Sequence, residues 1–191
     1  MTAILYFFYF ITLSSSSVGH ATISPSSHLE SDTIYWSPSS KLTWSDFRAK
    51  NFDSSVYKRF DTLKCHIDTY SKVGITFSFK FENKKPFFIV SAVFIRSGSW
   101  SSVDDEPETL LHEQGHFDMA EIYSRRLRDE MLKYQDLDLT QFIKTFYEKY
   151  TLINTNYLEE SMRFDLMTTT SLHLHLYLKE IKKRLEASEI K

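Results

Sequence analysis

Two apolar stretches in the first half of the chain have the spacing of β-strands. Apolar side chains occupy every second position of residues 74–81, namely Ile75, Phe77, Phe79 and Phe81. A period of two predicts a strand with one buried face. Residues 87–95 (FFIVSAVFI) are almost continuously apolar and predict a more deeply buried strand. Residues 83–86 (NKKP) interrupt the pattern between them, so we expect a hairpin with a loop of four or five residues.

After residue 105 the spacing of apolar positions changes to that of a helix. A helix over residues 106–133 would align one stripe of side chains at about 100° per residue: His112, His116, Met119, Ala120, Tyr123 and Leu127. Asp105 and Glu108 predict a capping box, with Pro107 in the first turn, where its missing N–H costs nothing. Further helices are expected over residues 138–150, opened by Asp138 and Gln141, and over residues 154–165 and 171–187.

This order of strands followed by helices indicates the α+β class. We expect an N-terminal antiparallel sheet, then a helix carrying the candidate chemistry, then a C-terminal helical subdomain. A chain of 191 residues fits one domain with a short leader, and we place that domain at residues 35–188.

The N-terminal segment has the pattern of an export signal. Residues 3–13 (AILYFFYFITL) are apolar, and small residues before position 22 favour cleavage after Ala21, so residues 1–21 are expected to be a signal peptide. The apolar run is shorter than the about 20 residues that cross a bilayer. It has no Lys or Arg before it, which leaves an uncleaved anchor or a buried first strand as alternatives. Residues 22–34, rich in Ser, Thr and Pro, are predicted to be a flexible leader, and the expected location is secreted or periplasmic.

Composition and charge narrow the possible partners. With 42% hydrophobic and 16% aromatic residues the chain is expected to fold. The net charge is -2, and no basic run interleaved with aromatics indicates nucleic-acid binding. The densest basic group alternates with acids at helical spacing and predicts a solvated helix face: Lys179, Lys182, Lys183 and Arg184. Cys65 is the sole cysteine, so no internal disulfide can form, and we expect a buried, inert thiol.

The candidate chemistry lies in residues 112–116 (HEQGH), an H-E-x-x-H motif inside a predicted helix. His112 and His116 stand one turn apart on the same face, so both imidazoles can reach one zinc ion at about 2.0–2.1 Å. Zinc lowers the pKa of a bound water toward about 7. Glu113 lies beside the pair as general base and can then pass the proton to a leaving amine. A surface helix with an incidental histidine pair is the alternative.

Gly115 within the motif is unfavourable for a helix. It costs roughly 1 kcal/mol relative to Ala. We therefore expect another part of the protein to approach the backbone beside the metal at this position.

A catalytic zinc needs a third protein ligand, and the spacing leaves its identity open. Glu121 lies about half a helix circumference from His112 and is expected to pair with Arg125 instead. Asp118 also points away from the histidine stripe. The remaining candidates all lie downstream: Glu159, Glu160, Asp165, His173 and His175.

Several segments together resemble a bacterial family of exported proteins known as domain of unknown function 922, whose members are regarded as zinc-dependent proteases. The matching segments extend over about residues 35–185: Trp36, the LTWSDF of residues 42–47, Val93 and Phe94, Ser99 and Trp100, the HEQGHFD of residues 112–118, and Glu121, Tyr123, Arg125 and Leu127. The resemblance implies a zincin-like fold and proteolytic activity, without a substrate.

The resemblance also bears on the third ligand. In the family's closing motif, RYDxxTxHG, this chain has Asp165 and Thr168 at matching positions but Thr170 where the family has a histidine. Tyr177 and Glu180 likewise replace a Gln and a Trp. We assign Asp165 as third ligand, with His173 as the alternative.

Two hypotheses from different classes follow. The first is an exported zinc peptidase, in which residues 87–95 pair with an extended peptide substrate and Trp44 and Trp100 either line the cleft or pack in the core. The second is a degenerate zincin that binds a partner or an envelope component without cleaving it, which the altered closing motif favours. The intact Glu113 favours the enzyme. A purely structural zinc site is disfavoured because such sites are closed by four Cys or His ligands.

Overall fold

The computed structural model describes residues 31–50, 68–82 and 85–189 of the chain. The predicted signal peptide, most of the predicted leader and Cys65 lie outside these ranges. The end of the predicted leader lies inside them, because Thr33 and Ile34 belong to the first strand.

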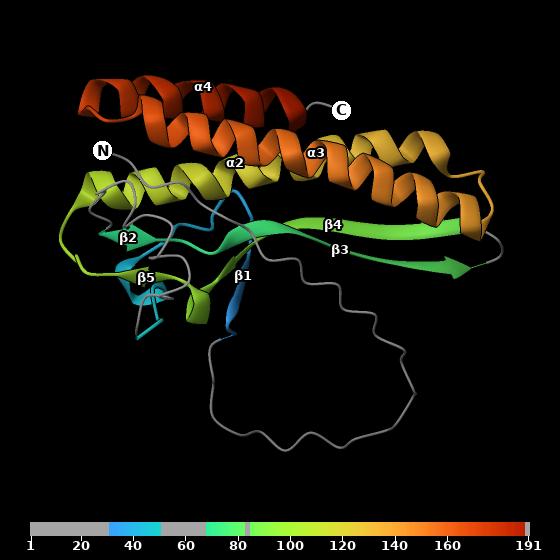
Figure 1. The fold of residues 1–191 in the computed structure, drawn as a ribbon, viewed down its shortest axis with the longest axis horizontal. Coiled ribbons are helices and arrows are strands. Elements are labelled where there is room, and N and C mark those ends of the chain that lie inside the picture. Colours follow the sequence, from blue (N-terminus) through green and yellow to red (C-terminus); the bar gives the residue numbers. More distant parts are fainter. Residues whose placement is uncertain (1–30, 51–67, 83–84, 190–191) are drawn as a thin grey trace, which may run out of the picture.

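The described strands form two small antiparallel sheets (Figure 1). The larger has the order β1-β4-β3, and its strands are β1 (Thr33–Tyr35), β3 (Val73–Glu82) and β4 (Lys85–Ile95). The smaller pairs β2 (Thr69–Tyr70) with β5 (Trp100–Ser101). The α+β class and the order of strands before helices are therefore confirmed.

The β3–β4 hairpin has the predicted strands but a tighter connection. Glu82 pairs with Lys85, which leaves two residues between the strands, so the predicted loop of four or five residues was wrong. Pro86 lies inside β4 at its second position, close to the strand end, where a missing backbone donor is tolerated.

Three helices follow in the described part of the chain: α2 (Pro107–Met131), α3 (Leu139–Met167) and α4 (Ser171–Glu189). They lie on one side of the larger sheet, and α2 packs against β3 and β4 as well as against α3 and α4 (Figure 1). Short 3-10 turns stand at Trp44–Asp46 (η1), Arg96–Gly98 (η2) and Leu132–Tyr134 (η3).

Aromatic side chains join the hairpin to the first half of α3. Phe77 lies 4.5 Å from Phe146, and Phe79 lies 6.0 Å from Phe142, measured between ring centroids. The apolar residues of β3 lie two apart in sequence, and their partners on α3 lie four apart. Each spacing keeps side chains on one face of its element, so the two apolar faces can pack together. None of the helices in the described ranges is both long and apolar enough to cross a membrane.

The start of α2 differs from the prediction. Glu106 is the N-cap and makes no side-chain capping bond, so the capping box of Asp105 and Glu108 was wrong, although Pro107 does begin the helix. The Glu108 carboxylate instead accepts a hydrogen bond from Ser171 Oγ at the start of α4. A hydrogen bond between the N-terminal turns of α2 and α4 is present where the sequence predicted a capping bond within α2.

The two helices predicted over residues 138–150 and 154–165 are one continuous helix. Asp138 caps it as predicted, accepting from the backbone N–H of Gln141 at 2.9 Å. Tyr150, Asn154 and Tyr157 are all buried at i, i+4 and i+7, so packing carries the helix through a stretch of low intrinsic propensity.

Candidate metal centre

The two histidines of the motif converge on one point. His112 and His116 project from α2 with their Nε2 atoms 3.1 Å apart. Asp165 approaches from α3, and its Oδ1 lies 3.0 Å from His112 Nε2 and 2.9 Å from His116 Nε2. The three atoms form a nearly equilateral triangle. In the described ranges these residues make a group able to hold a metal ion.

A single stripe of α3 surrounds the imidazoles. Ser161, Asp165 and Thr168 stand at i, i+4 and i+7 and therefore share one face of that helix. Ser161 Oγ lies 2.8 Å from His116 Nδ1, and Thr168 Oγ1 lies 3.1 Å from His112 Nδ1. Each imidazole is thus held at one nitrogen by a hydroxyl and faces Asp165 with the other.

The hydrogen bonds of Thr168 assign the tautomer of His112. Thr168 Oγ1 donates to the backbone carbonyl of Phe164 at 2.6 Å, so its single proton is used there. The hydroxyl oxygen must then accept from His112 Nδ1–H. In the neutral ring this leaves a lone pair on His112 Nε2, directed toward Asp165, which is the tautomer that a metal ligand requires.

The donor set fits a divalent cation. Lone-pair atoms about 3 Å apart repel one another unless a proton or a metal ion lies between them. Asp165 Oδ2 is also buried and has no hydrogen-bond partner among the described residues. Ligands at about 2.0–2.1 Å from a tetrahedral zinc stand about 3.3 Å apart, close to the observed triangle, and two imidazoles with one carboxylate form a common catalytic zinc set.

The directions of the pKa shifts of His116 and Asp165 indicate that the cluster favours positive charge. Burial lowers the pKa of His116, but the charge and hydrogen bond of Asp165 outweigh burial and raise it above 6.5. Burial likewise raises the pKa of Asp165, and the two histidines outweigh it, so the pKa of this carboxyl lies below its usual 3.8. Without a metal, a proton on His116 therefore supplies the positive charge that the site needs.

Glu113 lies next to the histidine pair and is held by another element. Its side chain is buried, with 5% of the residue exposed. Ser71, between β2 and β3, donates its hydroxyl proton to Glu113 Oε2. The negative charge of Glu113 also contributes to raising the pKa of His116.

A close approach does occur at Gly115, as the sequence predicted. A Cβ added there would lie 2.7 Å from Phe164 Cζ and 2.9 Å from Leu178 Cδ2. The Phe164 ring stacks on His112, with ring centroids 4.5 Å apart, and meets His116 edge-on at 5.0 Å. Glycine thus lets an aromatic ring pack against both imidazoles.

The acidic residues on the far side of α2 have other partners. Glu121 pairs with Arg125 at 2.9 Å, as predicted, and with Arg128 at 2.5 Å. Asp118 accepts hydrogen bonds from Trp36 Nε1 and Gln114 Nε2, both at 2.8 Å. Neither carboxylate belongs to the metal cluster.

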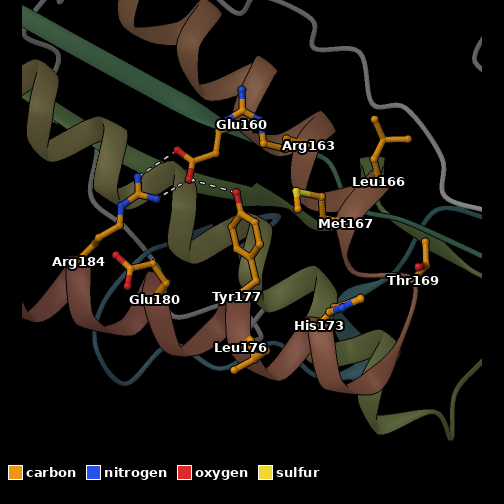
Figure 2. A pocket seen from close by; sticks show the side chains of 10 residues that line it. All are labelled: Glu160, Arg163, Leu166, Met167, Thr169, His173, Leu176, Tyr177, Glu180 and Arg184. Carbon is orange, nitrogen blue, oxygen red and sulfur yellow. Dashed lines mark hydrogen bonds and ion pairs between the residues drawn. The ribbon is translucent and has the colours of Figure 1, made fainter.

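Two further ligand candidates line a groove of about 700 Å³ between α3 and α4 (Figure 2). Glu160 is paired there with Arg184 and accepts a hydrogen bond from Tyr123 at 2.5 Å. His173 stands exposed at the other end of the groove (Figure 2). Arg184 is therefore half-buried, and the predicted solvated basic face was wrong for this residue. The other members of that group, Lys179, Lys182 and Lys183, are exposed as predicted.

The remaining candidates are placed away from the cluster. Glu159 and His175 are exposed on α3 and α4. Trp44 packs against Phe47 with ring centroids 5.5 Å apart, and Trp100 pairs with Tyr70 in the small sheet. Both tryptophans are half-buried.

Sequence reasoning missed Ser71, Ser161 and Phe164. The spacing of Ser161 four residues before Asp165 carried a signal, because both must share a helix face. Nothing local pointed to Ser71, which lies 42 residues from its partner.

No family model, curated protein or solved structure matches this chain.

Proposed function

We propose that this protein is an exported, zinc-dependent hydrolase with a zincin-like active site, and that its substrates are peptides or proteins. The observation that carries the proposal is the convergence of His112 Nε2, His116 Nε2 and Asp165 Oδ1 within 3.1 Å of one another. The choice of peptide bonds and the zincin-like architecture rest on the resemblance of the sequence motifs.

Each residue has a defined part in this proposal. His112, His116 and Asp165 hold the metal. Zinc, when bound, supplies a Lewis acid and lowers the pKa of a coordinated water. Glu113 accepts the proton of the attacking water on its carboxylate and delivers it to the nitrogen of the leaving amine. Ser161 and Thr168 keep both imidazoles turned toward the ion.

A second function, binding without cleavage, is favoured by the burial of the centre. His116 and Asp165 are 1% and 2% exposed, and Glu113 is 5% exposed. The side chain of His112 reaches 17% exposure and is the most accessible of the ligand set. A metal centre this enclosed also suits a protein that binds a partner or envelope component.

Metal analysis and proteolysis of the purified protein separate the two functions. The peptidase proposal expects one zinc per chain and cleavage of a denatured protein, stopped by 1,10-phenanthroline. Glu113→Gln should lower kcat by about 10²–10⁴-fold and keep the zinc. Glu159→Gln, an exposed glutamate on α3, is the matched control and should behave as wild type.

The other outcomes are equally decisive. A chain that binds no zinc removes the premise of both functions. Bound zinc without hydrolysis across a broad peptide library favours the binding protein.

A further inference from the structure

We infer that Ser71 is a positioning residue that aims the Glu113 carboxylate, and that Ser99 and Trp100 exist to hold Ser71 in place. This inference rests on the proposed function. It gives a role to the Ser99–Trp100 pair, which the sequence singles out.

Ser71 is a buried serine whose hydroxyl group bonds to Glu113. It lies between β2 and β3, is 1% exposed, and donates its hydroxyl proton to Glu113 Oε2. A glutamate side chain has several rotatable bonds, and holding it in a single orientation is costly in entropy. The bond from Ser71 fixes one carboxylate oxygen and so limits where the other can point.

The backbone on both sides of Ser71 is pinned by the Ser99–Trp100 pair. Lys72 N donates to Ser99 Oγ at 2.9 Å, and Ser99 Oγ donates to Ile95 O at 2.7 Å. Ser99 is fully buried. On the other side, Tyr70 pairs with Trp100 in the small sheet.

A backbone hydrogen bond also joins the segment around Ser71 to β4. Ile95 N donates to Lys72 O at 2.9 Å, which ties the end of β4 to the residue after Ser71. The two sheets therefore meet at Ser71, and their junction sets its distance from α2. A shift of about 1 Å in a group that supports the reacting atoms can cost about 100-fold in rate.

The chemistry of the contact suits a general base. A lysine or arginine at this position would form an ion pair with Glu113 and compete with the proton that it must accept. In the described ranges, no ion pair of Glu113 is present. A neutral hydroxyl orients the carboxylate without adding charge.

Kinetics of Ser71 variants test the role in catalysis. Ser71→Ala should lower kcat by about 100-fold, with KM and zinc content unchanged. Ser71→Thr keeps the hydroxyl and should retain more of the rate, and Ser99→Ala should show an intermediate loss. Ser78→Ala removes an exposed serine on β3 and is the matched control. A wild-type kcat for Ser71→Ala overturns the inference, as does a loss that appears in KM alone.

Unfolding of the metal-free protein tests the contact independently of activity. The shifts in thermal midpoint for Ser71→Ala and Glu113→Ala should be non-additive in the double variant, because both remove the same bond. Additive shifts overturn the inference. Should wild-type protein cleave nothing, the proposed function fails, while this cycle still decides whether Ser71 holds Glu113. If Ser71→Ala does not fold, the same cycle is run with Ser71→Cys, whose thiol is only a weak hydrogen-bond donor. The shifts should again be non-additive, and additive shifts again overturn the inference.

Discussion

The two opposite faces of α2 both carry buried polar side chains, but the protein satisfies them differently. On one face Gln114 and Asp118 are bonded to the segment before residue 50, through Leu42 N at 2.9 Å and Trp36 Nε1 at 2.8 Å. On the other face His112 and His116 direct nitrogen atoms at each other and at one carboxylate oxygen.

Neighbouring residues of one motif thus differ in their contacts. Gln114 holds another segment of the chain, whereas His112 and His116 form the candidate metal site. The Gln114 face is complete with protein partners alone, so its residues fix how the N-terminal segment lies on α2. On the histidine face, the converging nitrogen and oxygen atoms need a proton, or the proposed metal ion, between them. Changes to the first face should therefore cost stability, and changes to the second should cost metal.

The largest expected effect is the loss of the metal on removing a ligand. His116→Ala should abolish stoichiometric zinc binding, because the nearly fully buried His116 nitrogen cannot be replaced by a neighbour. Elemental analysis after gel filtration measures it. His173→Ala, an exposed histidine on α4, is the control. Retention of one zinc per chain by His116→Ala would show that the ion sits elsewhere.

The next effect should come from the hydroxyl that orients His112. Thr168→Val keeps the shape of the side chain and removes the acceptor for His112 Nδ1–H. We expect zinc affinity to fall about 10–100-fold, the usual cost of losing such a support, as measured by competition with a fluorescent chelator. Thr169→Val is the exposed neighbouring control; equal affinities for both variants would contradict the assigned tautomer.

The opposite face should respond in stability instead. Trp36→Phe removes the Nε1 donor to Asp118 and weakens the contact with Arg125, whose guanidinium carbon lies 5.1 Å from the Trp36 ring. Hydrogen bonds to charged groups contribute about 1.5–3 kcal/mol. Since Gln114 still bonds to Asp118, we expect a loss of about 1–2 kcal/mol in chemical denaturation. Zinc affinity should be unchanged, and a parallel loss of zinc would mean that the two faces are coupled.

Gly115→Ala should affect both properties, because Gly115 lies between the faces. The added Cβ would press on Phe164 and Leu178, an overpacking that costs about 1–3 kcal/mol, against about 1 kcal/mol gained in helix propensity. We expect net destabilisation of about 1 kcal/mol and weaker zinc binding, since Phe164 stacks on His112. Leu178→Ala in the same chain should restore part of both. A stabilised variant with normal affinity would show that the ring moves freely.

The smallest effect should be in the pH dependence of stability, and its sign should depend on the metal. In the metal-free protein the pKa of His116 is raised above 6.5. Its pair with Asp165 therefore stabilises fully below pH 6.5, and this contribution is lost as pH rises through the raised pKa. Zinc requires unprotonated His116, so zinc-linked stability is lost as pH falls through the same pKa.

Denaturation of wild type and Asp165→Asn from about pH 6 to about pH 9 would measure both trends. The difference between the two proteins should shrink with rising pH in the presence of a chelator and grow with rising pH in the presence of zinc. The same slope under both conditions would contradict a shared proton and metal site.

The spacing of apolar residues along the chain was sufficient to predict the elements that bury one regular face. The alternation in β3, the apolar run of β4 and the stripe of α2 each follow from side-chain geometry within one segment. The capping of the start of α2 and the continuity of α3 did not follow, because they depend on what packs against each helix: Ser171 bonds to Glu108, and Tyr157 and Asn154 are buried.

The same division holds for the candidate site. One helical turn set His112 beside His116, so the sequence by itself determined the pair, and it made Glu113 their neighbour. The resemblance of the closing motif singled out Asp165, but its approach to the histidines, in place of Glu160 or His173, was decided by tertiary structure. Its carboxylate reaches the histidines only because α3 crosses α2 with that face inward, while Glu160 turns toward Arg184 (Figure 2). Ser71 likewise meets Glu113 only through the junction of two sheets. Local spacing fixes which side chains share a face, whereas contacts between distant segments depend on how whole elements pack.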